Sequence, residues 1–320
     1  MTISRTSWRS HRELERAVPD SYLLHLNEGL SWNLTASEGT REWAARLARA
    51  VGLRSGYVGG RPTIRFIRGL PVPVSGGGRY RPSDDAELNR LAGEGWVFRT
   101  REYVRIWSLP GRTDLIFELL NTPLDHVEIT MMRQAMQAVY EAVMISGGLP
   151  VHSALVEHEG TGFLLAGVGG SGKTTCCERL PNGWTHRADD EALVVRTTNG
   201  DPAVHPAPTW NSDRLKSGDG QWNIGAGLPL GGIFFLEKSS RDEALPLGRG
   251  EAAARINGSA NQALRNRFHN LDSAMRREWR SRLFDNSCRL SRDVRSYVLR
   301  VTRTGRFWTV IEDAINGIAT

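Results

Sequence analysis

The residues of this sequence that most clearly predict chemistry form a glycine-rich segment that ends in a lysine and two threonines. Residues 167–174 match the pattern G-x-x-x-x-G-K-[ST], with an apolar run before them and a short helix-compatible run from Thr175 after them. Backbone N–H groups of such a loop converge on phosphate oxygens, and the following helix N-terminus adds positive potential. Lys173 would reach the outer phosphates, and the Thr174 hydroxyl would hold Mg²⁺. The residues predicted to bind ATP are Gly167, Val168, Gly169, Gly170, Ser171, Gly172, Lys173, Thr174 and Thr175.

Lysine is rare in this chain, which makes Lys173 informative. Of the 41 basic residues only Lys173, Lys216 and Lys238 are lysines, and the others are arginines. An ammonium is a compact point charge, whereas a guanidinium is a planar fork. Lys173 therefore supplies the compact cation that a phosphate-binding loop needs, in a chain whose other basic residues are almost all arginines.

An acidic pair follows the loop. Asp189 and Asp190 stand far enough beyond Lys173 for a short helix ended by residues 181–183, a turn, and a strand that returns beside the loop. One carboxylate could accept the proton of an attacking hydroxyl, while the other holds a metal directly or through water. The alternative is a solvated acidic turn that leads into a strand at 192–196.

Two histidines are further candidates. His152 precedes the strand before the loop, where an imidazole could contact a transferring phosphoryl group, although its position alone favours a structural role. His205 opens the rigid, aromatic segment 205–210, which either packs on the core or lines a substrate cleft; the sequence leaves both open. The other histidines share no constellation, so neither a zinc site nor a Ser/His/Asp triad is supported.

The elements that must position these residues differ between the two halves of the chain. In the first half the patterns predict a hairpin at 22–34, a helix ended by Gly52, a Gly/Pro loop at 71–82, strands at 103–109 and 113–119, and one long helix at 124–145 with core methionines. In the second half they predict strands at 153–157, 161–166 and 230–236, a hairpin at 191–206, helices within 250–283, a strand at 297–302 and a C-terminal helix.

Composition narrows the class of protein. A 320-residue chain with 40% hydrophobic and 24% charged residues is long enough for two packed domains, and it has no apolar run long enough to span a bilayer. The three cysteines have no metal-type spacing, which fits the cytoplasm. A net charge of +6 invites a nucleic-acid partner. The densest basic stretch, 276–282, is interrupted by Glu278 and Trp279, so a solvated helix face is favoured and nucleic acid is not expected.

Several segments together resemble a known superfamily. Residues 149–156, 165–175, 189–191, 205–210 and 228–237 are similar to HPr kinases and ATP-dependent phosphoenolpyruvate carboxykinases. Within that group they resemble the HPr-kinase-related proteins of SynChlorMet-type peptide-maturation cassettes, which are associated with radical SAM enzymes and PqqD-like peptide-recognition proteins.

The resemblance implies a fold and roles for the site residues. It implies an α/β fold: a P-loop-containing C-terminal domain at 148–320, with a mixed sheet flanked by helices, after a smaller α+β domain at 1–147. It further implies that His152 lies close to the transferring group, that Asp189 is the general base, and that Asp190 lies nearer the metal. Thr174 replaces the usual serine. The glutamate and arginine signature of HPr kinases is not recognisable, although Glu237 and a later arginine could substitute.

The resulting expectation is a cytoplasmic kinase that uses ATP and Mg²⁺ to phosphorylate a serine or threonine hydroxyl on a ribosomal precursor peptide or small protein. The alternative is a nucleotide-regulated, non-catalytic module that binds a peptide through the edge of the 22–34 hairpin. Carboxykinase chemistry is disfavoured, because the lysine and arginine patterns of that branch are absent. Radical SAM and PqqD-like maturation proteins are expected partners, and self-association is left open.

Overall fold

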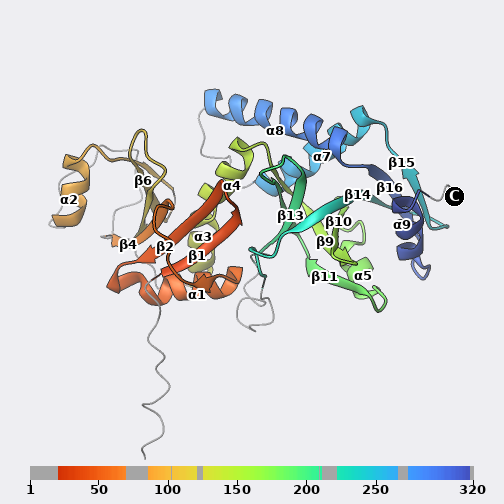
Figure 1. The fold of residues 1–320 in the computed structure, drawn as a ribbon, viewed down its shortest axis with the longest axis horizontal. Helices are drawn as coiled ribbons and strands as arrows, with labels where there is room; N and C mark the ends of the chain where they lie inside the picture. Colours follow the sequence, from red (N-terminus) through yellow and green to blue (C-terminus); the bar gives the residue numbers. More distant parts are fainter. Residues whose placement is uncertain are drawn as a thin grey trace, which may run out of the picture.

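The computed structural model contains two mixed β-sheets flanked by helices, so the protein is an α/β protein (Figure 1). The structure describes residues 21–69, 86–101, 103–120, 125–208, 210, 222–265 and 273–317. The predicted Gly/Pro loop at 71–82 lies outside these residues. Within them, no helix combines the length and the apolar character that a membrane span requires.

The first sheet has seven strands in the order β3-β1-β2-β4-β7-β6-β5. Their bounds are β1 Ser21–Asn27, β2 Leu30–Ala36, β3 Arg54–Ser55, β4 Thr63–Gly69, β5 Val97–Thr100, β6 Val104–Ser108 and β7 Leu115–Leu120, with α2 at Ala86–Gly93. The predicted hairpin is confirmed as the antiparallel pair β1–β2. Strand β4 pairs with β2 on the inner side, while on the outer side β3 covers only Tyr22 and Leu23 of β1.

Helix α1 (Arg41–Val51) covers this sheet, as the sequence predicts. Trp43, Leu47 and Val51 recur on one face of the helix and are all buried. Gly52 ends the helix with a left-handed φ of 71°, a conformation in which only glycine is unstrained. A side chain there would also collide with the Trp222 carbonyl, so this turn ties the first half of the chain to the second.

The long helix predicted at 124–145 is instead two helices, α3 (Asp125–Ala135) and α4 (Gln137–Ile145). The break is at Met136, whose ψ of −11° departs from the helical value. The helices run between the two sheets, with α3 against β6 and α4 against β2, β8 and β12 (Figure 1). Met131, Met132, Met136 and Met144 are buried, which confirms their predicted role in the core.

The second sheet has nine strands, with β11-β9-β10-β14-β13-β12-β8 as its main path and β16 and β15 branching from β14. The bounds are β8 Leu149–Val151, β9 Ser153–His158, β10 Thr161–Ala166, β11 Trp184–Ala188, β12 Glu191–Arg196, β13 Pro202–Ala207, β14 Leu228–Lys238, β15 Glu243–Pro246 and β16 Ser296–Val301. The predicted strands in this half are therefore confirmed.

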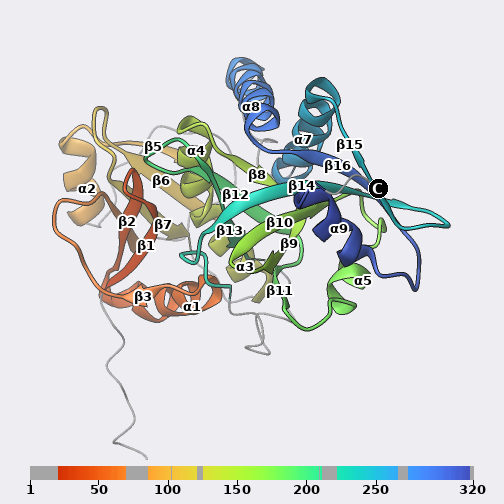
Figure 2. The ribbon, with the colours of Figure 1, turned by 45° about the vertical axis from the view of Figure 1, so that its right-hand side comes forward.

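Helices cover both faces of this sheet (Figure 2). Helices α7 (Arg249–Leu264) and α8 (Ser273–Asp293) lie on one face, and α5 (Lys173–Glu178) and α9 (Phe307–Ile315) lie on the other. Helix α8 continues about ten residues past the predicted end at 283, since Leu290 and its neighbours still face the core. One hydrophobic cluster runs from β1 through α4 to α8, so the two sheets share a core across the predicted domain boundary.

Asn286 fastens α8 to the end of α4. The buried amide nitrogen donates to the carbonyls of Met144 (2.8 Å) and Gly148 (2.9 Å). We expect Asn286→Ala to lower the free energy of unfolding by about 2 to 4 kcal/mol, because two buried carbonyls lose their donor. Urea denaturation measures the difference between this variant and Asn261→Ala. Asn261 is half-buried, and its side-chain hydrogen bonds to other described residues stay within α7. Equal losses would show that the Asn286 bonds carry no special weight.

Candidate functional site

Strand pairing in the second sheet gathers the predicted site residues at one edge. Strand β9 runs antiparallel to both β10 and β11, with Ser153 opposite Ala166 and Leu155 opposite Ala188. Because antiparallel neighbours run in opposite directions, the start of β9 lies beside the ends of β10 and β11. His152, the glycine-rich loop and the acidic pair therefore meet, although they are far apart in the sequence.

The glycine-rich loop has an open outer surface. Gly170 and Gly172 have φ values of 78° and 106°, which side-chain-bearing residues rarely adopt. A Cβ atom on Gly169, Gly170 or Gly172 would meet no other atom, so the loop backbone faces open space. At Gly167, by contrast, a Cβ would lie 2.5 Å from the Ser171 hydroxyl, because the Ser171 side chain occupies the inside of the loop. An anion could thus approach the backbone, as a phosphate-binding loop requires.

Lys173 lies beneath this loop and is only 9% exposed. The ammonium donates to the Gly167 carbonyl at 2.7 Å and contacts Nε2 of His152 at 3.1 Å. Burial lowers the pKa of the amine, and the nearby Asp190 carboxylate opposes that shift. The two polar contacts hold the cation at the base of the loop.

His152 links Lys173 to the acidic pair. Nδ1 lies 3.2 Å from Oδ1 of Asp190, on the opposite side of the ring from the ammonium. Since the ammonium only donates, we assign the proton of a neutral ring to Nδ1, which donates to the carboxylate. Burial, and then the charge of Lys173, lower the pKa of the imidazole and favour this neutral form. The backbone of His152 is fixed by Ser259 of α7, whose hydroxyl donates to its carbonyl at 2.8 Å.

The two aspartates have different surroundings. Asp189 is only 10% exposed, and its Oδ1 lies 2.8 Å from Nε2 of His186 on β11. Asp190 is 50% exposed and faces His152 and Lys173. Thr174 and Thr175 are exposed in the first turn of α5, on the solvent side of the loop. The structure therefore brings every predicted site residue to one edge of the sheet and separates the two carboxylates by environment.

Sequence reasoning missed three residues at this edge. The only sequence signal for His186 is its position three residues before Asp189. Nothing in the sequence distinguishes Ser259 from other serines. Tyr140 of α4 donates to Oε2 of Glu191 at 2.7 Å, which joins the acidic turn to the helix between the sheets.

Glu237, at the end of β14, pairs with Arg255 of α7 at 3.1 Å. In the described part of the chain, no group of three or more His, Cys, Asp or Glu side chains forms a metal-binding cluster.

His205, by contrast, belongs to the core. It is 2% exposed, and Nδ1 donates to the Ile224 carbonyl at 2.8 Å. Trp210, at the end of the same segment, packs against the main hydrophobic cluster. Of the two interpretations that the sequence leaves open, the described residues of 205–210 support packing on the core; residue 209 lies outside them.

The burial of His205 predicts a dependence of stability on pH. Burial lowers the pKa of this histidine, so as pH falls below about 6.5 the unfolded chain takes up a proton that the folded chain does not. We expect stability to fall from pH 7 toward pH 5, and the slope to be shallower in His205→Gln, by up to about 1.4 kcal/mol per pH unit. Urea unfolding at each pH measures both slopes, and identical slopes would contradict the prediction.

Comparison with models of known protein families identifies the family of this chain. The family model described as SynChlorMet cassette protein ScmC matches residues 115–316, which is more than half of the chain and includes every site residue described above. None of the curated proteins compared with the chain matches it. The chain belongs to the family of SynChlorMet cassette proteins ScmC.

Proposed function

We propose that the protein is an ATP-dependent phosphotransferase that moves the γ-phosphoryl group to a serine or threonine hydroxyl of a precursor peptide or small protein. The observation that carries the proposal is the line of contacts from Lys173 through His152 to Asp190 at the mouth of an open glycine-rich loop. Similarity of the second half to HPr kinases is part of this proposal, as are a cytoplasmic location and radical SAM and PqqD-like partners.

Binding would rest on the loop backbone and Lys173. The open outer surface at Gly169, Gly170 and Gly172 lets N–H groups approach phosphate oxygens without side-chain interference. The buried ammonium supplies positive charge where the outer phosphates would lie. Thr174 and Asp190, both accessible, would hold Mg²⁺, which when bound neutralises charge on the phosphates.

Proton transfer would rest on Asp189. In the reaction the acceptor oxygen forms a bond to the γ-phosphorus, the bond from that phosphorus to the β,γ-bridging oxygen breaks, and ADP leaves. The proton of the hydroxyl passes to Asp189, and His186, at 2.8 Å and one-third exposed, connects this carboxylate to solvent. Neutral His152 orients the Lys173 ammonium through Nε2 and thereby fixes its direction.

The alternative is a peptide-binding module without catalysis. On the outer side of the hairpin expected to offer an edge, β3 covers only Tyr22 and Leu23, so among the described residues the rest of β1 has no strand partner there. Phosphotransfer distinguishes the two functions.

The test is a mass-spectrometric assay with purified protein, Mg²⁺-ATP and the peptides encoded beside its gene. The proposal expects one added phosphate on a serine or threonine of a peptide, and ADP in equal amount. Bound ATP that is never transferred to any of those peptides would replace the kinase by the nucleotide-regulated module.

A further inference from the structure

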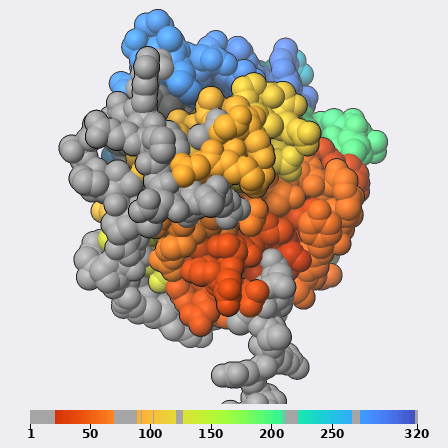
Figure 3. All heavy atoms as spheres, turned by 90° about the vertical axis from the view of Figure 1, so that its left-hand side faces the viewer, coloured from red at the N-terminus to blue at the C-terminus, as the bar shows by residue number. Residues whose placement is uncertain are grey.

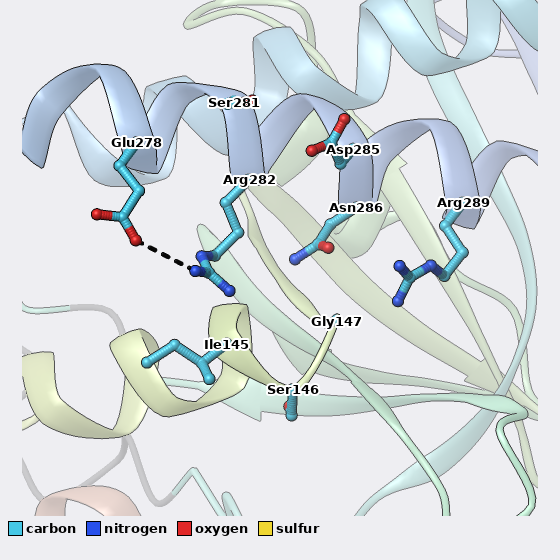
Figure 4. A pocket seen from close by; sticks show the side chains of 9 residues that line it. All are labelled: Ile145, Ser146, Gly147, Glu278, Ser281, Arg282, Asp285, Asn286 and Arg289. Atoms are coloured by element: carbon cyan, nitrogen blue, oxygen red, sulfur yellow. Dashed lines mark hydrogen bonds and ion pairs between the residues drawn. The ribbon is translucent and has the colours of Figure 1, made fainter.

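A pocket of about 400 Å³ opens between the end of α4 and the side of α8, away from the glycine-rich loop (Figure 4). The charged residues that line it are all on α8, and none of them belongs to the site described above. They are Glu278, Arg282, Asp285 and Arg289. Since two carboxylates balance two guanidinium groups, the pocket selects neither an anionic nor a cationic ligand.

The order of these four charges along α8 is the informative feature. From Glu278 to Arg289 the signs alternate: negative, positive, negative, positive. Steps of four, three and four residues keep the four side chains on one side of the helix. In the reverse direction the same row of charges has the opposite sign at every position. Such a row is complementary to a second copy of itself that runs antiparallel.

A two-fold axis would bring opposite charges together. Glu278 and Arg289 lie about 8 Å along the helix on either side of one midpoint, which falls just after Leu283. Arg282 and Asp285 lie about 2 Å on either side of the same midpoint. If a two-fold axis through this midpoint relates two antiparallel α8 helices, Glu278 faces Arg289 of the second copy. Arg282 then faces Asp285 of the second copy.

All four charges are accessible to a second chain. Asp285 and Arg289 are exposed and have a spacing that allows an ion pair on a helix, yet neither pairs with any residue that the structure describes. Figure 4 shows the reason: Arg289 points toward the end of α4 and Asp285 points away from it. Glu278 and Arg282 contact each other at 3.3 Å, but their side chains remain 67% and 34% exposed.

Exposed apolar side chains lie beside the charges. Ile145, at the end of α4, lines the same pocket and is 62% exposed, and Met275, seven residues before Arg282, is 37% exposed. Covering such side chains supplies affinity that exposed ion pairs alone do not. Helix α8 forms the top of the molecule in Figure 3, where its outer surface is open to a second chain. The Asn286 bonds to α4 hold the helix in this position.

We propose that the protein forms a homodimer through this face, with the α8 helices of two copies packed antiparallel. The charges fix the orientation, because a parallel arrangement in register would place like charges opposite each other. A partner of one sign would be repelled by two of the four charges, whereas a second copy meets an opposite charge at each. The inference does not depend on the phosphotransferase proposal, because it concerns different residues.

Sedimentation velocity of the full chain measures self-association. We expect the sedimentation coefficient to rise from that of a 35.5 kDa monomer to that of a dimer as the protein concentration increases from about 1 to 100 μM. Added salt should move the transition to higher protein concentration, because exposed charge pairs are screened. A chain that stays monomeric over the whole range would overturn the inference.

Charge reversal tests the pairing of residues. Arg289→Glu and Glu278→Arg should each weaken dimerisation at least about tenfold, because each places like charges opposite each other at both ends of the helix pair. Arg280→Glu is the matched control: it reverses the charge of an exposed residue of α8 outside the pocket and should change dimerisation less than about twofold. Circular dichroism checks that each variant is folded.

Combining the two reversals decides whether the helices are antiparallel. In a mixture of Arg289→Glu and Glu278→Arg, positions 278 and 289 are negative in one chain and positive in the other. Heterodimers should therefore form within about threefold of the wild-type affinity. The double variant should dimerise by itself, because exchanging the two charges preserves the pairing. No recovery in the mixture or the double variant, or an equal loss in Arg280→Glu, would overturn the inference.

Discussion

Lys173→Ala is expected to reduce phosphotransfer at least about 100-fold, the loss that follows removal of one preorganised donor to a developing charge. The ammonium is buried at the base of the loop and is held by Gly167 and His152, so no neighbouring side chain on this network can replace it. Nucleotide binding should weaken as well, because the ground-state phosphates also lose this cation. Isothermal titration with Mg²⁺-ATP, together with the mass-spectrometric assay, measures both effects.

Lys238→Ala is the matched control for this prediction. Lys238 ends β14 on the surface and is exposed, so its loss removes the same charge without touching the loop. It should retain transfer and binding within about twofold. A similar loss in both variants would mean that overall charge, not the position of Lys173, decides activity.

Asp189→Asn is expected to reduce phosphotransfer by about 10² to 10⁴-fold and to leave binding of Mg²⁺-ATP nearly unchanged. The amide keeps the size of the side chain but cannot accept the proton of the acceptor hydroxyl. The carboxylate is largely buried beside His186 and lies apart from the contacts between Asp190, His152 and Lys173, which explains why binding should survive. Rapid-quench measurements of ADP and phosphopeptide, with titration calorimetry, separate transfer from binding.

Asp190→Asn distinguishes the two carboxylates. Asp190 is exposed and accepts from His152 near the ammonium, so its replacement should raise the Mg²⁺ concentration needed for half-maximal transfer. If Asp189→Asn abolishes binding and Asp190→Asn abolishes only transfer, the two roles are reversed. His186→Gln should lower transfer less than Asp189→Asn, because Asp189 would still be present to accept the proton.

Much of the fold could be predicted because its signals are local. The β1–β2 hairpin, α1 with Gly52 at its end, and the strands around the glycine-rich loop each follow from spacing or turn chemistry within a few residues. The single helix expected at 124–145 was wrong, because periodicity of apolar residues does not reveal the change of ψ at Met136. The end of α8 was also misplaced, since its last turns depend on contacts with distant parts of the core.

The sequence by itself determined the conformation of the glycine-rich loop. The positive φ of Gly170 and Gly172 and the lysine that follows are properties of a short segment, so residue types alone encode them. Only the tertiary structure decided the partners of that segment: His152 between Lys173 and Asp190, His186 beside Asp189, and Ser259 behind His152. The same holds for the pocket between α4 and α8. Such contacts depend on strand register and helix packing between residues far apart in the chain, which local spacing cannot specify.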